Sequence, residues 1–134
     1  MTSTRSRLWA GRALSALATL FLLLDGVMKL ARAQVSLDAM EQLGYPAPSV
    51  PLIGALLLAG VILYVVPATS VVGAIWLTAY LGGAVATHVR VGHPWLSHAL
   101  FPVYVAAFAW GGLLLRRPAL LAELRPGAGG TSLP

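Results

Sequence analysis

The sequence TAYLGGAVATHVRVGHP, from Thr78 to Pro94, decides how the chain folds. It begins as an apolar helix and ends with His88, Arg90 and His93 before a turn that contains glycine and proline. Three ionisable side chains therefore lie within six residues of a chain that carries few charges. This pattern predicts the end of a transmembrane helix that opens onto a polar pocket at one membrane face.

The composition indicates a chain that is embedded in a lipid bilayer. Of its 134 residues, enough for one domain, 58% are hydrophobic and 10% are charged. Soluble domains average about 25% charged residues, so this chain has too little polar surface to face water on all sides. Its net charge of +5 comes from basic residues that flank apolar runs, which argues against a nucleic-acid partner. The chain has no cysteine, which excludes disulfide exchange and iron–sulfur clusters.

Four apolar runs are long enough to cross the hydrocarbon core as helices. They cover about residues 8–30, 50–66, 71–89 and 97–115. A signal peptide is the alternative for the first run, but that run is too long, and Asp25 and Lys29 replace the small residues of a cleavage site. We therefore expect an all-α, four-helix transmembrane bundle in up-down-up-down order over residues 1–117.

Polar segments join these runs and follow the last one. Residues 31–49 form the one long connection, in which Ser36 could cap a short helix that stops at Gly44. The C-terminal tail, residues 118–134, ends in glycine, proline and polar residues and is predicted to be disordered. Pro102 lies inside the fourth run, where it either kinks the helix or stands in the first turn of a helix that begins late.

The distribution of basic residues orients the bundle. One group lies near the two chain ends and consists of Arg5, Arg7, Arg12, Arg116, Arg117 and Arg125. The opposite side carries Lys29, Arg32 and Arg90. By the positive-inside rule both termini are predicted to be cytoplasmic, in agreement with an even number of spans. Trp9 and Trp95 are expected in the aromatic belts at the two interfaces.

Asp25 and Lys29 are the most deeply placed charges of the first run. They are four residues apart, so on a helix they share a face and can form an ion pair. A charge left alone in the membrane would cost about 3 kcal/mol or more, which pairing lowers. Two interpretations stay open: a proton or ligand site whose carboxylate is held by Lys29, or a structural pair that fixes the first helix against the others.

A stripe of small and polar residues runs along one face of the third helix. Its members are three or four residues apart: Gly73, Trp76, Tyr80, Gly83, Thr87 and Arg90. Such stripes are typical of helix packing in membranes. The outer part, from Tyr80 onward, could also line a cavity.

Three histidines, His88, His93 and His98, follow one another at intervals of five residues. This is not a helical ligand spacing, although His88 ends one helix and His98 begins the next, so that the two could meet. A bis-histidine haem or metal site is the less favoured interpretation, and we expect no metal ion here. Proton transfer near neutral pH, or hydrogen bonding at the interface, suits histidine better.

Four segments together resemble the DoxX-like family of small bacterial four-helix membrane proteins. They are FLLLDGVMK (21–29), MEQLGYP (40–46), YLGGAVATHVRVGHP (80–94) and SHALFPVY (97–104), and the resemblance covers about residues 12–117. Most members of this family have no assigned activity. Relatives in the wider DoxX/DoxD group are subunits of a thiosulfate:quinone oxidoreductase or associate with membrane redox enzymes, so the resemblance implies a quinone-linked role.

One position departs from the family pattern. Members often carry a glutamate in the second helix, in the order Ile-Gly-x-x-Glu-Leu, whereas here the segment 53–58 reads IGALLL, with Leu57 at that place. A role that needs a carboxylate there is therefore in doubt. Asp25 is left as the only deeply placed acid.

These observations predict a polar pocket near the outer leaflet. Its candidate residues are Asp25, Lys29, Tyr80, Thr87, His88, Arg90, His98 and Tyr104. The leading hypothesis is an accessory subunit of a membrane redox system in the bacterial inner membrane, which binds a quinone or another small lipophilic ligand. Besides the lipid bilayer, the candidate partners are a redox protein and a second copy of the chain. The alternatives are a small transporter and a structural membrane partner; a stand-alone enzyme is not expected, and no residue is assigned as catalytic.

Overall fold

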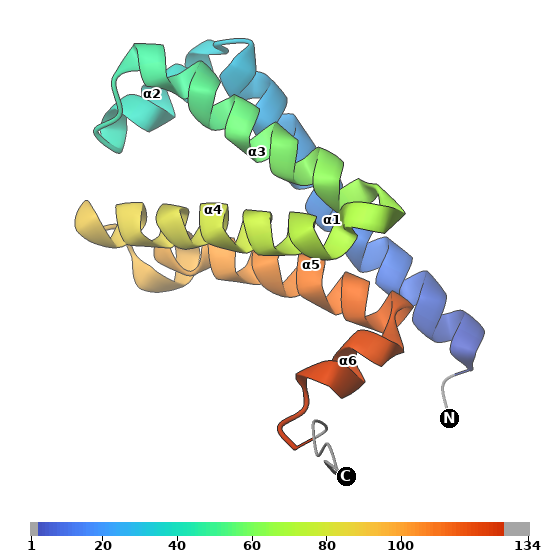
Figure 1. Cartoon of the computed structure of the whole chain (residues 1–134). Helices are drawn as coiled ribbons and strands as arrows, with labels where there is room; N and C mark the ends of the chain where they lie inside the picture. The colour runs from blue at the N-terminus through green and yellow to red at the C-terminus, as the bar shows by residue number, and fades with distance from the viewer. Residues whose placement is uncertain (1–2, 128–134) are drawn as a thin grey trace, which may run out of the picture.

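The computed structural model describes residues 3–127, and in this range the chain is helical (Figure 1). The four long helices are α1 (Thr4–Leu30), α3 (Val50–Val65), α4 (Ser70–Arg90) and α5 (Phe101–Arg116). Shorter elements are α2 (Gln34–Gln42), α6 (Pro118–Leu124), the 3₁₀ turns η1 (Ala47–Ser49) and η2 (Pro67–Thr69), and the π-helical η3 (Trp95–Ala99). The predicted all-α architecture is confirmed.

The four long helices form a closed ring. α1 packs along α3 and α5, and α4 packs along the same two helices, whereas the diagonal pair α3 and α5 meets through the side chain of Tyr64, which reaches the carbonyl of Ala109. Each long helix, together with the short turn that precedes α3, α4 or α5, is long and apolar enough to cross a membrane. The ends of α1 and α5 that lie nearest the two chain termini are at the same end of the bundle, whereas α2 lies at the other end (Figure 1). We call these the terminal end and the α2 end.

Proline and left-handed residues set the helix boundaries. Pro51, Pro102 and Pro118 stand in the first turns of α3, α5 and α6, where their missing N–H groups are not needed. Pro102 therefore belongs to a helix that begins late, after the π-helical turn η3, and it does not kink a longer one. At the α2 end, Gly44 and Gly92 adopt φ of +86° and +75° and close the C-termini of α2 and α4.

Two local predictions are wrong. Ser36 does not cap α2: the helix begins at Gln34, with Ala33 at the cap and no side-chain capping bond, and Ser36 is buried within it. Residues 118–124, predicted as disordered, form helix α6, because Pro118 starts a new helix and Leu120 packs against the core of the bundle. The rest of the predicted tail from residue 128 onward lies outside the described residues.

Glycine lets the helix backbones approach closely. A Cβ atom on Gly54 of α3 would lie 2.8 Å from the backbone nitrogen of Leu30, and one on Gly73 of α4 would lie 2.2 Å from the backbone nitrogen of Tyr64. Only a residue without a side chain fits at either position. Small residues at helix interfaces are the usual means of tight packing in membranes, where lipid removes most of the hydrophobic driving force.

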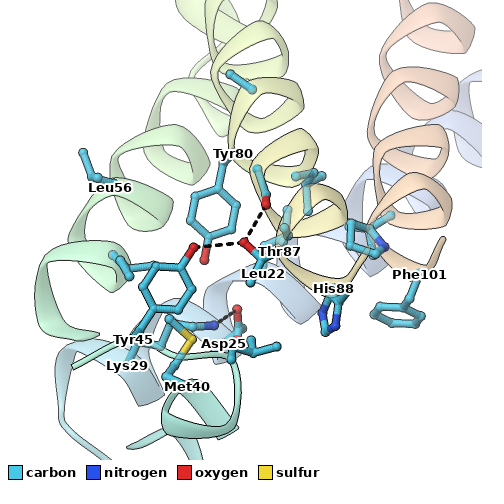
Figure 2. A pocket seen from close by; sticks show the side chains of 18 of the residues that line it. Leu22, Asp25, Lys29, Met40, Tyr45, Leu56, Tyr80, Thr87, His88 and Phe101 are labelled. Atoms are coloured by element: carbon cyan, nitrogen blue, oxygen red, sulfur yellow. Dashed lines mark hydrogen bonds and ion pairs between the residues drawn. The ribbon is translucent and has the colours of Figure 1, made fainter. Parts of the chain in front are cut away.

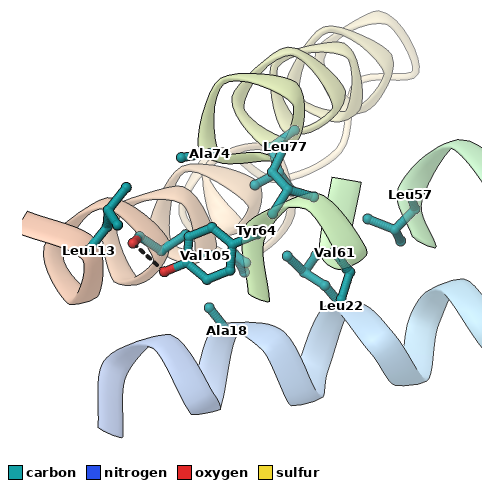
Figure 3. Close-up of a cluster of buried hydrophobic side chains, with 11 residues drawn as sticks. Ala18, Leu22, Leu57, Val61, Tyr64, Ala74, Leu77, Val105 and Leu113 are labelled. Carbon is teal, nitrogen blue, oxygen red and sulfur yellow. Dashed lines mark hydrogen bonds between the residues drawn. The ribbon is translucent and has the colours of Figure 1, made fainter. Parts of the chain in front are cut away.

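The core lies between the four long helices and extends from the floor of the α2 end towards the terminal end (Figure 3). Leu22, Leu57, Leu77 and Leu113, one from each long helix, are almost fully buried there. Tyr64 is the polar member of the core, and its hydroxyl donates to the carbonyl of Ala109 at 2.6 Å. This packing holds the helices together at one end, and α3 and α4 diverge from their connecting turn towards the α2 end (Figure 1).

Candidate functional site

A cavity of about 420 Å³ occupies the α2 end of the bundle, between the long helices and beneath α2 (Figure 2). Most of its wall is apolar. Five of the eight residues predicted for the polar pocket line it: Asp25, Lys29, Tyr80, Thr87 and His88. They come from α1 and α4, which lie diagonally across the ring from each other. The cavity lies above the core because the helices diverge only at this end.

Asp25 and Lys29 form an ion pair in the wall of the cavity. The side chain of Lys29 is 11% exposed and that of Asp25 is 35% exposed, so the carboxylate is the more accessible partner. Because Gly54 lets α3 lie against the backbone at the end of α1, the aliphatic stem of Lys29 is covered by α3. No other ion pair is present within residues 3–127. A paired, partly buried carboxylate inside an apolar wall can bind a polar ligand group in place of water.

Two tyrosines and a threonine make the polar surface on the opposite side. Thr87 donates its hydroxyl to the carbonyl of Gly83 at 2.8 Å, and the Tyr45 hydroxyl donates to Thr87 at 2.9 Å. The Tyr80 hydroxyl is directed into the space between Tyr45 and the ion pair (Figure 2). In the described part of the chain this hydroxyl has no hydrogen-bond partner, so it is free to donate to a bound molecule.

Arg90 lies outside the cavity and holds the connection that covers it. Its guanidinium group donates to the carbonyl of Leu43 and lies 3.3 Å from the position that a Cβ atom of Gly44 would occupy. Leu43 and Tyr45 both line the cavity, and Tyr45 is bound to Thr87 on α4. Arg90 and Tyr45 therefore fasten the segment after α2 to the end of α4, on either side of Gly44.

The three histidines cluster at the outer rim. His88 Nδ1 and His93 Nδ1 are 2.8 Å apart. The ring centroid of His98 lies 6.2 Å from that of His88 and 5.2 Å from that of His93. The turn at Gly92 brings the first two together, because the backbone N–H of His93 donates to the carbonyl of His88. Among residues 3–127 no group of three or more His, Cys, Asp and Glu side chains has the geometry of a metal site. His88 joins this cluster to the cavity.

Besides Arg90, two other predicted residues lie away from the cavity. His98 is exposed and pairs with the hydroxyl of Ser97 at 2.8 Å. Tyr104 is 44% exposed and donates to the carbonyl of Leu96 at 3.1 Å, on the outside of α5. Its position follows from the late start of α5, which turns Tyr104 away from the interior.

Sequence reasoning missed the residues that the α2 connection contributes. Met40 and Tyr45 both line the cavity, and Met40 is buried. The available signal was the length of residues 31–49, because the one long connection in a compact bundle has to cover some part of it.

A model of the DoxX-like family matches residues 13–112 of the chain. The chain belongs to this family. The match includes the cavity residues of α1, α3 and α4 and the start of α5, so the four-helix core and the cavity are parts of the family domain. No curated protein and no solved structure matches the chain.

Membership of the DoxX-like family and the four apolar helices identify an integral, multi-pass membrane protein. At the family position where a glutamate is often found, Leu57 is fully buried in the core. Asp25 is the one acid in the cavity wall. The carboxylate available to a ligand therefore comes from α1.

Proposed function

We propose that this DoxX-like protein binds a small lipophilic molecule of the quinone class in the cavity at its α2 end. The observation that carries the proposal is the composition of the cavity wall: mostly apolar side chains, with a few polar groups that converge on one space. Its volume of about 420 Å³ is within the range of small-molecule sites, about 300–1,000 Å³.

The polar groups suit a ligand that carries hydrogen-bond acceptors. The Tyr80 hydroxyl is free to donate, Lys29 keeps two further N–H groups beyond its bond to Asp25, and His88 has a second ring nitrogen beside the one that faces His93. A quinone offers two carbonyl oxygens on opposite sides of a flat apolar ring. Donors on α1 and α4 lie on opposite sides of the cavity, as two such acceptors would require.

The rim of the cavity is apolar and faces lipid. Phe21 and Phe101 pack edge to face with ring centroids 5.2 Å apart, and each is more than 40% exposed. Leu56, on the other side of the cavity, is 44% exposed (Figure 2). A ligand with a long hydrocarbon tail can keep its tail in the bilayer beside the two phenylalanines or beside Leu56 while its polar ring occupies the cavity.

The chain would act as an accessory subunit of a membrane redox system in the bacterial inner membrane. The positive-inside rule supports cytoplasmic termini, because six arginines lie towards the chain ends, and this orientation places the cavity near the outer leaflet. The chain supplies no thiolate, so the electrons would have to come from a partner protein or pass between bound quinones. The redox role rests on likeness to the wider DoxX/DoxD group.

Binding of a short-chain quinone by the purified full chain tests the proposal. Calorimetric titration of the wild-type chain should give saturable binding. His88→Ala removes a donor, and Asp25→Asn removes the charged partner that orients Lys29, so each variant should express normally but weaken binding by about tenfold or more. Tyr104→Phe is the matched control, because Tyr104 lies outside the cavity. Wild-type affinity in both cavity variants would contradict the proposal.

A further inference from the structure

A second cavity lies at the terminal end of the bundle, far along the helices from the first. Its volume is about 370 Å³, and it opens between α1, α3 and α5. The residues that line it are Arg12, Ser15, Ala16, Thr19, Leu20, Tyr64, Val65 and Arg116. Two arginines thus line one space whose lining contains no carboxylate.

The guanidinium group of Arg116 is held in a fixed orientation. Its Nε donates to the carbonyl of Gly112 at 3.2 Å and its Nη2 donates to Ser15 Oγ at 2.9 Å. Ser15 is 8% exposed, and its hydroxyl donates a hydrogen bond to the Tyr64 hydroxyl at 2.8 Å, which in turn donates to the carbonyl of Ala109. Guanidinium has five N–H groups, so this network orients the fork and leaves further donors for an anion.

Arg12 brings the second positive charge to the same place. It lies one turn before Ser15 on α1, is exposed, and its guanidinium carbon is 5.3 Å from the ring centroid of Trp9. Tryptophan is favoured at the boundary between hydrocarbon and headgroups, so this contact holds the Arg12 charge at headgroup depth. Two cations that share a cavity repel each other, and an anion bound between them removes that repulsion.

The apolar part of the wall points to the source of the anion. Leu20 is 63% exposed and Val65 is 53% exposed, and both lie on the surface that a bilayer would cover. A molecule that fits has a negative group for Arg12 and Arg116 and hydrocarbon for Leu20 and Val65. A free phosphate ion satisfies only the first of these conditions.

We propose that this cavity binds the phosphate of an anionic phospholipid from the leaflet at the terminal end, with the acyl chains along Leu20 and Val65. The charge balance of that end agrees with a negatively charged ligand. It carries Arg5, Arg7, Arg12, Arg116, Arg117 and Arg125, with Glu123 as its one acid within residues 3–127. Basic pockets between transmembrane helices on the cytoplasmic side are suited to anionic headgroups.

Lipid retention measured by native mass spectrometry tests this site. The full chain in micelles is titrated with phosphatidylglycerol, with phosphatidylcholine, or with inorganic phosphate. We expect phosphatidylglycerol to be retained most strongly and Arg12→Gln to weaken its retention about fivefold, the loss expected for one arginine at an anionic headgroup. Arg125→Gln removes the same charge from the same end but not from the cavity, and should change retention less than twofold.

Three outcomes would overturn the proposal. Equal retention of phosphatidylcholine would show that the negative charge is not recognised, and equal losses in Arg12→Gln and Arg125→Gln would show that only the overall charge of this end matters. Displacement of the lipid by millimolar inorganic phosphate would assign the site to a free anion. Arg12 is the variant of choice because it is exposed, whereas Arg116 also supports Ser15 and its loss could unfold the chain.

Discussion

Replacement of Gly73 by alanine tests the packing that holds α3 against α4. A Cβ atom at this position would lie 2.2 Å from the nitrogen and 2.5 Å from the Cα of Tyr64, and 2.6 Å from the carbonyl carbon of Leu63. All three are backbone atoms, so no side-chain rotation can relieve the contact. The two helices would have to separate by about 1.2 Å to restore an ordinary van der Waals distance of 3.4 Å.

The expected loss of stability is about 1–3 kcal/mol, the usual cost of overpacking a core. Alanine also favours the helix by up to about 1 kcal/mol relative to glycine, and a matched control separates this gain from the packing loss. Gly82 lies on the same helix with nothing within 4 Å of its Cβ position, and it does not line the cavity. Gly82→Ala should therefore be neutral or slightly stabilising, while Gly73→Ala is destabilising.

Equilibrium unfolding in mixed micelles with increasing SDS, followed by circular dichroism, measures both variants against the wild type. The difference between the two variants gives the packing term, because both gain the same helix propensity. If Gly73→Ala unfolds at the same SDS fraction as Gly82→Ala, the close approach of α3 and α4 is not what holds this end of the bundle, and the reasoning fails.

Three further predictions concern single side chains. Tyr64→Phe should lower the free energy of unfolding by about 1–2 kcal/mol, because the hydroxyl accepts from Ser15 and donates to a backbone carbonyl inside the core. The same SDS titration measures this loss, and an unchanged unfolding midpoint would show that the two hydrogen bonds contribute nothing to stability. Arg32, which follows the C-cap of α1, has a φ of +56°, so Arg32→Gly should stabilise the chain by about 1 kcal/mol, seen as a higher melting temperature. Tyr45→Phe removes the bond to Thr87 and should speed amide hydrogen exchange after α2 without changing exchange in α5; unchanged exchange at both places would show that Tyr45 does not hold the connection.

The membrane fold could be predicted from the sequence because its strongest determinant is composition along the chain. A run of about 20 apolar residues can form few structures other than a membrane-spanning helix, and each of the four runs forms a helix long and apolar enough to span a membrane. The stripe on α4 lines the cavity from Tyr80 to Thr87, while Gly73 packs against α3, because residues three and four apart stay on one face of a helix.

The rest of the candidate site depends on tertiary geometry that periodicity does not encode. Arg90 reaches away from the cavity because the carbonyl of Leu43 lies beside it, and that neighbour is 47 residues away in sequence. Tyr104 faces outward because α5 begins after the π-helical turn η3, which has more residues per turn than an α-helix, so the residues that follow it do not keep the directions of one continuous α-helix. Helix α6 is too short for a periodic apolar pattern to be recognised in the sequence. It forms because Pro118 starts a new helix and Leu120 packs against the bundle.

Occupancy of the cavity at the α2 end is the most direct test of the proposed function. Native mass spectrometry of the chain, extracted gently from its own membrane, should show an adduct of quinone mass on the 14.0 kDa polypeptide. Gly83→Phe fills the cavity from α4, where the Cβ position of Gly83 faces open space, and should remove that adduct. A bare chain in the wild type, or the same adduct in both proteins, would contradict ligand binding at this site.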